Sequence, residues 1–70
     1  MKLSARNVLK GTIKAIDIGA VNVDVVVEVA PGLEVSAIIT KKSSENLGLK
    51  VGKQVYAVVK ATNVMIGVDH

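Results

Sequence analysis

The stretch that decides the fold is residues 21–40, VNVDVVVEVAPGLEVSAIIT. Valine stands at every odd position from 21 to 29, and three of the four residues between these valines are polar. A period of two is typical of a β-strand with one buried face. Pro31-Gly32 predicts a turn, and residues 33–40 resume the alternation. The stretch therefore predicts two antiparallel strands joined as a hairpin.

The segments on either side of this hairpin continue the β pattern and add one short helix. Upstream, residues 6–18 read as one long strand, in which Gly11 indicates a bulge or a bend. Downstream, residues 43–48 read as one or two helical turns. Ser43 is the expected N-cap of this helix, and Gly48 is the expected stop at its C-terminal end.

Two further strands are predicted near the end of the chain, at residues 54–60 and 63–68. The complete order is then five strands, with the short helix between the third and the fourth. This order fits an all-β fold, a five-stranded OB-type Greek-key barrel. No linker, internal repeat or low-complexity segment interrupts the pattern, so residues 1–70 are predicted to form a single domain.

The composition predicts an assembly of several chains. Half of the 70 residues are apolar, Tyr56 is the only aromatic residue, and cysteine is absent. Domains of this size are marginally stable alone, and they commonly gain stability from disulfides, a metal or partner subunits. The lack of cysteine excludes disulfides and thiolate metal sites. The surplus of valine and isoleucine therefore predicts a second apolar surface, buried between the subunits of an obligate homo-oligomer.

The charge and the hydropathy pattern narrow the class of protein. The net charge is +3 and the lysines are scattered, which suits anions but gives no basic run typical of nucleic-acid binding. The start, MKLS, lacks the apolar region of a signal peptide. Charged residues interrupt every apolar stretch before it reaches membrane-spanning length. These features predict a cytoplasmic protein that is not bound to a membrane.

Three short polar clusters fall at predicted strand ends or turns and form the candidate site. Together they offer hydroxyls, an amide, a guanidinium and an ammonium. Nearly all of these groups are hydrogen-bond donors, and donors of this kind suit a small oxyanion. The carboxylates lie on different predicted elements, so no acid–base pair is indicated. The chain therefore reads as a binding protein, not an enzyme. The clusters are Ser4-Ala5-Arg6-Asn7, Thr40 to Ser43, and Lys60-Ala61-Thr62.

Each cluster also has a plain structural explanation, and the residues alone leave both open. Arg6 could form a surface ion pair at the start of a strand. Ser43 could simply cap the helix, although a helix N-terminus also favours anions. Lys60 could reach solvent from the end of an apolar strand.

Taken in order, the three clusters resemble the molbindins, the small molybdenum–pterin-binding (Mop) proteins of bacteria, and the related TOBE-like modules. The similar motifs are Ser-Ala-Arg-Asn at residues 4–7, Ile-Thr-x-x-Ser at 39–43 before Leu-Gly-Leu, and Val-Lys-Ala-Thr at 59–62 before Val-Met-Ile. The resemblance covers essentially the whole chain. The same module occurs as the molybdate-sensing part of transcription regulators and as a C-terminal part of transporter ATPases.

The resemblance implies a function, an assembly and a set of roles. Such proteins are OB-type barrels that assemble as hexamers, trimers of dimers, and hold molybdate or tungstate between subunits. The lack of stacking aromatics here favours the bare oxyanion over a pterin cofactor. By motif, Ser4 and Arg6 would contact the oxyanion with Ala5 and Asn7 nearby, Thr40 and Ser43 would supply hydroxyls, Lys60 would neutralise the charge, and Ala61 and Thr62 would add backbone or hydroxyl donors.

The resulting prediction is intracellular molybdate or tungstate storage by a homohexamer without enzymatic activity. One alternative is a nucleic-acid-binding OB-fold domain. Domains that hold single strands stack bases on aromatic side chains, and Tyr56 alone is a poor platform. The other alternative is a purely structural assembly domain. The presence of Arg6, Lys60 and two hydroxyl clusters favours the oxyanion site over that alternative.

Overall fold

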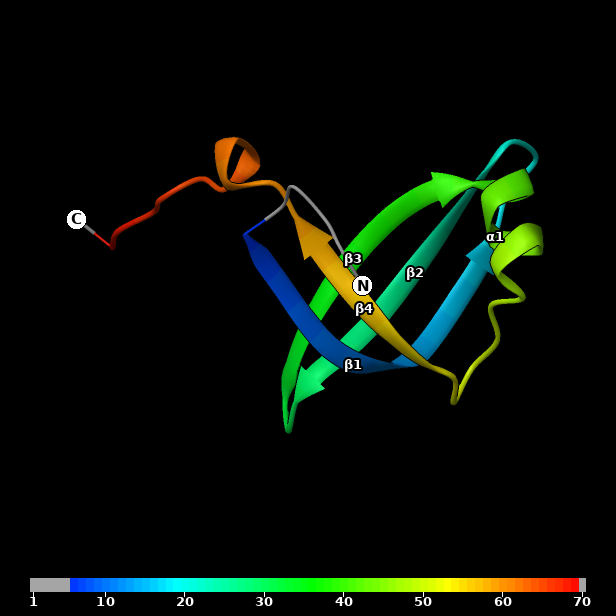
Figure 1. The fold of residues 1–70 in the computed structure, drawn as a ribbon, viewed down its shortest axis with the longest axis horizontal. Coiled ribbons are helices and arrows are strands. Elements are labelled where there is room, and N and C mark those ends of the chain that lie inside the picture. The colour runs from blue at the N-terminus through cyan, green and yellow to red at the C-terminus, as the bar shows by residue number, and fades with distance from the viewer. Residues whose placement is uncertain (1–5, 70) are drawn as a thin grey trace.

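The computed structural model describes residues 6–69 as one strongly curved antiparallel sheet with a short helix at one end (Figure 1). The strands lie in the order β3-β2-β1-β4, so β3 and β4 are the two edges. The elements in chain order are β1 (Asn7–Ile18), β2 (Asn22–Ala30), β3 (Leu33–Thr40), α1 (Lys41–Leu47), β4 (Gln54–Val59) and the 3-10 turn η1 (Ala61–Asn63).

The predicted hairpin is confirmed. In the β2–β3 register Asn22 faces Thr40 and Val27 faces Val35, and the chain turns between Ala30 and Leu33. The odd-numbered valines of β2 point into the curve of the sheet because successive strand side chains alternate between its faces. Among residues 6–69 the core is small and comprises four buried residues, with five half-buried apolar side chains packed against it. The four buried residues are Ile13, Val23, Val25 and Val27.

Gly11 lies where the backbone of β1 leaves no room for a side chain beside β2. A Cβ built there would lie 2.5 Å from the Glu28 carbonyl oxygen and 2.6 Å from Val27 Cγ1. The predicted irregularity of this strand is present just downstream, as a shift in the β1–β2 register between Ile13 and Ala15. The glycine and this bulge together let β1 bend while it changes partner from β4 to β2.

Gly11→Ala is therefore expected to lower the free energy of unfolding by about 1–3 kcal/mol, because the obstructing carbonyl belongs to the backbone and the strands themselves must move apart. Chemical denaturation measures the change. Asp17→Glu is the control, since it adds a methylene to an exposed position of the same strand. Equal stability of Gly11→Ala and the parent chain would show that the sheet accommodates the methyl group.

The short helix is present but begins earlier than predicted. Thr40, not Ser43, is the N-cap, and its Oγ1 accepts a hydrogen bond of 3.1 Å from the Ser43 N–H. The reason is that β3 ends at Thr40 in extended backbone, the conformation that a cap residue needs. The predicted stop at Gly48 is confirmed, with φ 63° in the left-handed region. Lys53 Nζ then donates to the carbonyls of Leu47 (2.6 Å) and Gly48 (3.3 Å) at the end of α1.

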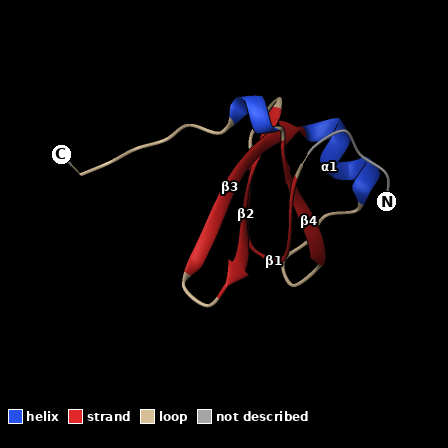
Figure 2. Ribbon diagram, turned by 60° about the vertical axis from the view of Figure 1, so that its left-hand side comes forward, coloured by secondary structure: helices blue, strands red, loops and turns tan. Residues whose placement is uncertain are grey.

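The prediction of a fifth strand at residues 63–68 is wrong for the single chain, which forms four strands in the part described. Residues 64–69 leave the body as an extended tail after η1, as Figures 1 and 2 show. An extended segment becomes a strand only when its N–H and C=O groups meet a neighbouring strand, and no strand of residues 6–69 pairs with this one. The segment is nevertheless apolar, and Met65 is 91%, Ile66 89% and Val68 77% exposed.

No helix among residues 6–69 is long and apolar enough to cross a membrane.

Candidate functional site

The first and the last polar cluster meet at one end of the sheet. β1 runs antiparallel to β4 with Asn7 opposite Val59, and Asn7 Nδ2 donates a 3.3 Å hydrogen bond to the Val59 carbonyl. Arg6 directly precedes β1 and Lys60 directly follows β4. The strand register therefore sets the two residues side by side, although 54 positions of sequence separate them.

The backbone after Lys60 turns sharply and presents polar groups to solvent. Lys60 is the extended N-cap of η1, and its carbonyl accepts the first hydrogen bond of the turn, 2.8 Å from the Asn63 N–H. The N–H groups of Ala61 and Thr62 precede that first bond and donate to no backbone carbonyl of residues 6–69. Lys60, Ala61 and Thr62 are all exposed.

Neither cation at this end, Arg6 or Lys60, forms an ion pair with a carboxylate of residues 6–69. Within residues 6–69 one ion pair forms, between Lys14 and Glu28 at 3.7 Å, and it lies away from Arg6 and Lys60. The surface ion pair considered for Arg6 is therefore not formed with any carboxylate of the described chain. No group of three or more His, Cys, Asp or Glu side chains among these residues could hold a metal ion. The arrangement suits an anion held by donors.

The middle cluster lies at the opposite end of the sheet. Thr40 faces Asn22 at the start of β2, and α1 lies well apart from η1 in Figure 1. Thr40 Oγ1 donates to Ser43 Oγ at 2.9 Å while it caps the helix, so the two hydroxyls form one exposed unit. The long β1 strand separates this unit from Arg6 and Lys60. One chain alone does not bring all three clusters together.

Two of the predicted site residues, Ser4 and Ala5, lie outside the described residues. Of the others, the fold brings Arg6, Asn7, Lys60, Ala61 and Thr62 to one end and places Thr40 and Ser43 at the other.

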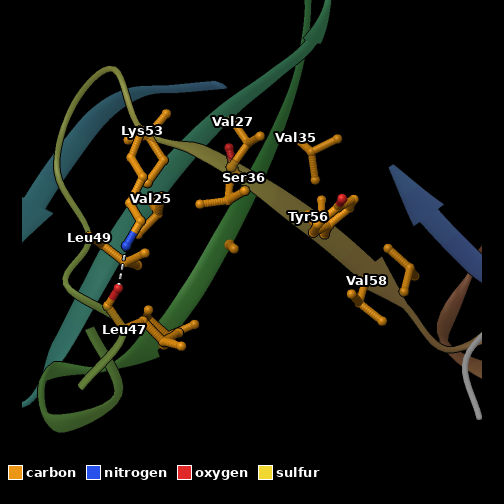
Figure 3. Close-up of a pocket in the computed structure, with 15 residues that line it drawn as sticks. Val25, Val27, Val35, Ser36, Leu47, Leu49, Lys53, Tyr56 and Val58 are labelled. Carbon is orange, nitrogen blue, oxygen red and sulfur yellow. Dashed lines mark hydrogen bonds between the residues drawn. The ribbon is translucent and has the colours of Figure 1, made fainter. Parts of the chain in front are cut away.

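None of the sequence motifs locates a second feature, an open apolar cavity of about 490 Å³ on the concave side of the sheet. Figure 3 shows it between the two edge strands, with Val35 on β3 and Val58 on β4. Its lining is mostly Val, Ile and Leu, and the Lys53 ammonium at its rim is engaged by helix carbonyls. Such a lining does not suit a dianion, so the cavity is separate from the polar clusters. The excess of apolar residues was its only signal in the sequence.

Comparison with known proteins shows which protein family this chain is similar to. The family model of the TOBE domain matches residues 3–66. The probable molybdenum-pterin-binding protein of Haemophilus influenzae is 44% identical over 69 residues, which cover 99% of this chain and 100% of the relative.

Two solved structures share the fold and much of the sequence. The molybdate-binding protein from Sporomusa ovata is 40% identical with a TM-score of 0.90, and the match covers 97% of this chain and 100% of that one. The cytoplasmic molybdate-binding protein ModG, solved with molybdate bound, is 47% identical with a TM-score of 0.92. That match covers 97% of this chain and 48% of ModG.

Proposed function

The chain belongs to the TOBE-domain family as a single Mop-type domain, and on this basis we propose that it binds molybdate and serves in intracellular molybdenum storage and homeostasis. The observation that carries the proposal is the meeting of Arg6 and Lys60 at one end of the sheet, without a carboxylate among the described residues to neutralise them. The molybdate-binding proteins from Sporomusa ovata and ModG support the choice of anion. The description of ModG as cytoplasmic supports the same compartment for this chain.

The groups at this end match what a tetrahedral dianion requires. Arg6 supplies a fork of charged donors and Lys60 supplies a compact charge, and hydrogen bonds from charged groups are the strong ones. The open N–H groups of Ala61 and Thr62, with the Thr62 hydroxyl, add neutral donors. Asn7 is held in place by its bond to the Val59 carbonyl. Ser4 and Ala5 complete the motif. The chemistry is binding, so we propose no enzymatic activity.

The position of Thr40 and Ser43 supports a site shared between chains. Their hydroxyls lie at the far end of the sheet, so they can contribute to the same oxyanion only if a second chain presents them. A homohexamer built as a trimer of dimers would satisfy this requirement. The exposed apolar side chains support an assembly as well, since monomeric proteins rarely expose so many. They include Val21, Ile38, Leu47 and Val51, besides the tail residues.

The alternatives are less well supported. A nucleic-acid-binding OB-fold domain would need stacking platforms, and the chain offers Tyr56 alone. A purely structural domain would give no reason for two adjacent cations without a partner in the described chain.

Calorimetry at fixed ionic strength should show molybdate and tungstate binding with similar affinity and sulfate binding far more weakly. Molybdate and tungstate are tetrahedral dianions of similar size, whereas the smaller sulfate cannot reach all the donors at once. Each donor left unpaired costs about 1–3 kcal/mol, which corresponds to about 5- to 150-fold in affinity. Equal affinity for all three anions would indicate a generic basic patch. A single-stranded oligonucleotide that binds with a steep salt dependence would favour the nucleic-acid alternative instead.

A further inference from the structure

The side chain of Asn7 is bound to the backbone of the neighbouring strand β4. Asn7 and Val59 are partners in the β1–β4 register, and Asn7 Nδ2 donates to the Val59 carbonyl over 3.3 Å. Among residues 6–69 this is the one hydrogen bond by which a side chain of one strand reaches the backbone of another. Both residues are half-buried, so water replaces the bond incompletely when the amide is removed.

The Val59 carbonyl and the Lys60 N–H belong to the same peptide unit, which is planar. A bond that fixes the direction of the carbonyl therefore also fixes the plane from which Lys60 continues. On its other side, the Lys60 carbonyl accepts the 2.8 Å bond from the Asn63 N–H. Lys60 is thus held between two hydrogen bonds, with φ −63° and ψ 135°. The origin of its long side chain depends on the bond that Asn7 makes.

The burial pattern separates Asn7 from the groups that can face an anion. Arg6 and Lys60 are exposed, whereas Asn7 is half-buried. Lys60 continues β4 in extended backbone, and successive side chains of an extended chain leave on opposite faces. The Lys60 side chain therefore leaves on the face opposite to Val59 and to its partner Asn7. An amide on that other face, with a donor already engaged by a carbonyl, is poorly placed to contact the same oxyanion.

We infer that Asn7 is a positioning residue, which aims Lys60 at the oxyanion without touching the anion through its own side chain. The inference rests on the proposed function and gives Asn7 a role different from the other members of its motif. A lysine side chain is flexible and loses conformational freedom when its ammonium is bound. A fixed starting direction reduces that loss, so the bond from Asn7 contributes to affinity through Lys60.

Asn7→Leu removes the donor and keeps the approximate shape of the side chain. It is expected to weaken molybdate binding about two- to tenfold, the range that the loss of one internal hydrogen bond gives. Asn7→Ala is measured beside it, because the smaller side chain cannot clash, and it should weaken binding in the same way. Calorimetry measures the affinity, and sedimentation confirms that the variants assemble as the parent chain does. Parent-like affinity of both variants would overturn the inference.

Gln54→Leu is the matched control. It removes an amide from the other end of β4, at an exposed position whose side chain forms no hydrogen bond within residues 6–69. Its affinity for molybdate should equal that of the parent chain. A loss as large as that of Asn7→Leu would show that any change in the β1–β4 pair weakens binding, and the specific role of Asn7 would be wrong.

A double-mutant cycle tests whether Asn7 acts through Lys60. An ammonium that is no longer aimed contributes less, so Lys60→Ala should weaken binding by a smaller factor in the Asn7→Leu background than in the parent chain. If Lys60→Ala costs the same factor in both backgrounds, Asn7 and Lys60 act independently. That result would contradict the positioning role and would favour a direct contact of Asn7 with the anion.

Amide hydrogen exchange without anion gives a readout that does not depend on binding. In Asn7→Leu the Asn63 N–H, which donates to the Lys60 carbonyl, should exchange faster than in the parent chain. The Ile13 N–H, which donates to the Lys53 carbonyl, should keep its rate. Unchanged exchange at Asn63 would show that Asn7 does not hold the turn. A parent chain that binds no molybdate ends the proposed function, whereas a parent chain that binds it with no coupling between Asn7 and Lys60 ends this inference alone.

Discussion

Lys60→Ala and Arg6→Ala are each expected to weaken molybdate binding by roughly thirtyfold or more. A dianion that leaves water for a contact between subunits loses hydration, and only fixed positive charge and aimed donors compensate. Removing one partner from such a contact commonly costs about 2–5 kcal/mol, which gives the stated factor. Calorimetry measures the affinity, and sedimentation without the anion should show that assembly is largely intact.

Lys50→Ala is the matched control for these two variants. Lys50 is exposed in the segment between α1 and β4, outside all three polar clusters, and its loss should change the affinity only slightly. If Lys50→Ala weakens binding as much as Lys60→Ala, the attraction is diffuse and the site is misplaced. If the Lys60 or Arg6 variant dissociates without anion, those residues hold the assembly together instead.

Ile13→Ala is expected to lower the free energy of unfolding by about 2–5 kcal/mol. Ile13 is 1% exposed and belongs to a core of only four buried residues, so little surrounding structure can collapse into the space left. A chain of this length has a total stability of roughly 4–10 kcal/mol, so the loss approaches half of it or more. Chemical denaturation at one fixed protomer concentration measures the change, because assembly contributes to the apparent stability.

Two further variants serve as comparisons for the denaturation of Ile13→Ala. Ile13→Val removes one methylene and should cost about 0.5–1.5 kcal/mol. Ile18→Ala makes the same truncation on the same strand at a residue that is 64% exposed, and its effect should be the smaller. If the Ile18 and Ile13 truncations proved equally costly, the four-residue cluster would not be the main core of the protein.

The sequence predicts the strands well because their signal is local. Apolar and polar residues alternate clearly along β2 and the first half of β3, which identifies their buried faces, whereas β1 and β4 are recognised as segments rich in Val and Ile. The start of α1 was harder to place. Thr40 and Ser43 are both good caps, and the choice depends on where β3 ends, which pairing with β2 decides.

The fate of the last apolar segment could not be predicted for a different reason. The apolar run at residues 64–68 favours a strand, but it does not identify the neighbouring strand that such a segment needs. The candidate site could not be predicted in full for the same reason, because strand pairing decides which of its residues become neighbours. Arg6 and Lys60 become neighbours through the β1–β4 register, whereas Thr40 lies at the other end of the sheet. A motif read along the sequence gives the residue types, and the strand order decides which of them meet.

The two halves of β1 pair with strands that lie at different distances from β1 along the sequence. Its second half pairs with β2, the next strand, whereas its first half pairs with β4, and the Asn7–Val59 contact closes a loop of 52 residues. Closing a longer loop costs more conformational entropy, so this contact is the least favoured by chain connectivity. It is also the contact that sets Arg6 beside Lys60. A change that loosens β4 would therefore separate the two cations while the local β2–β3 hairpin stays intact.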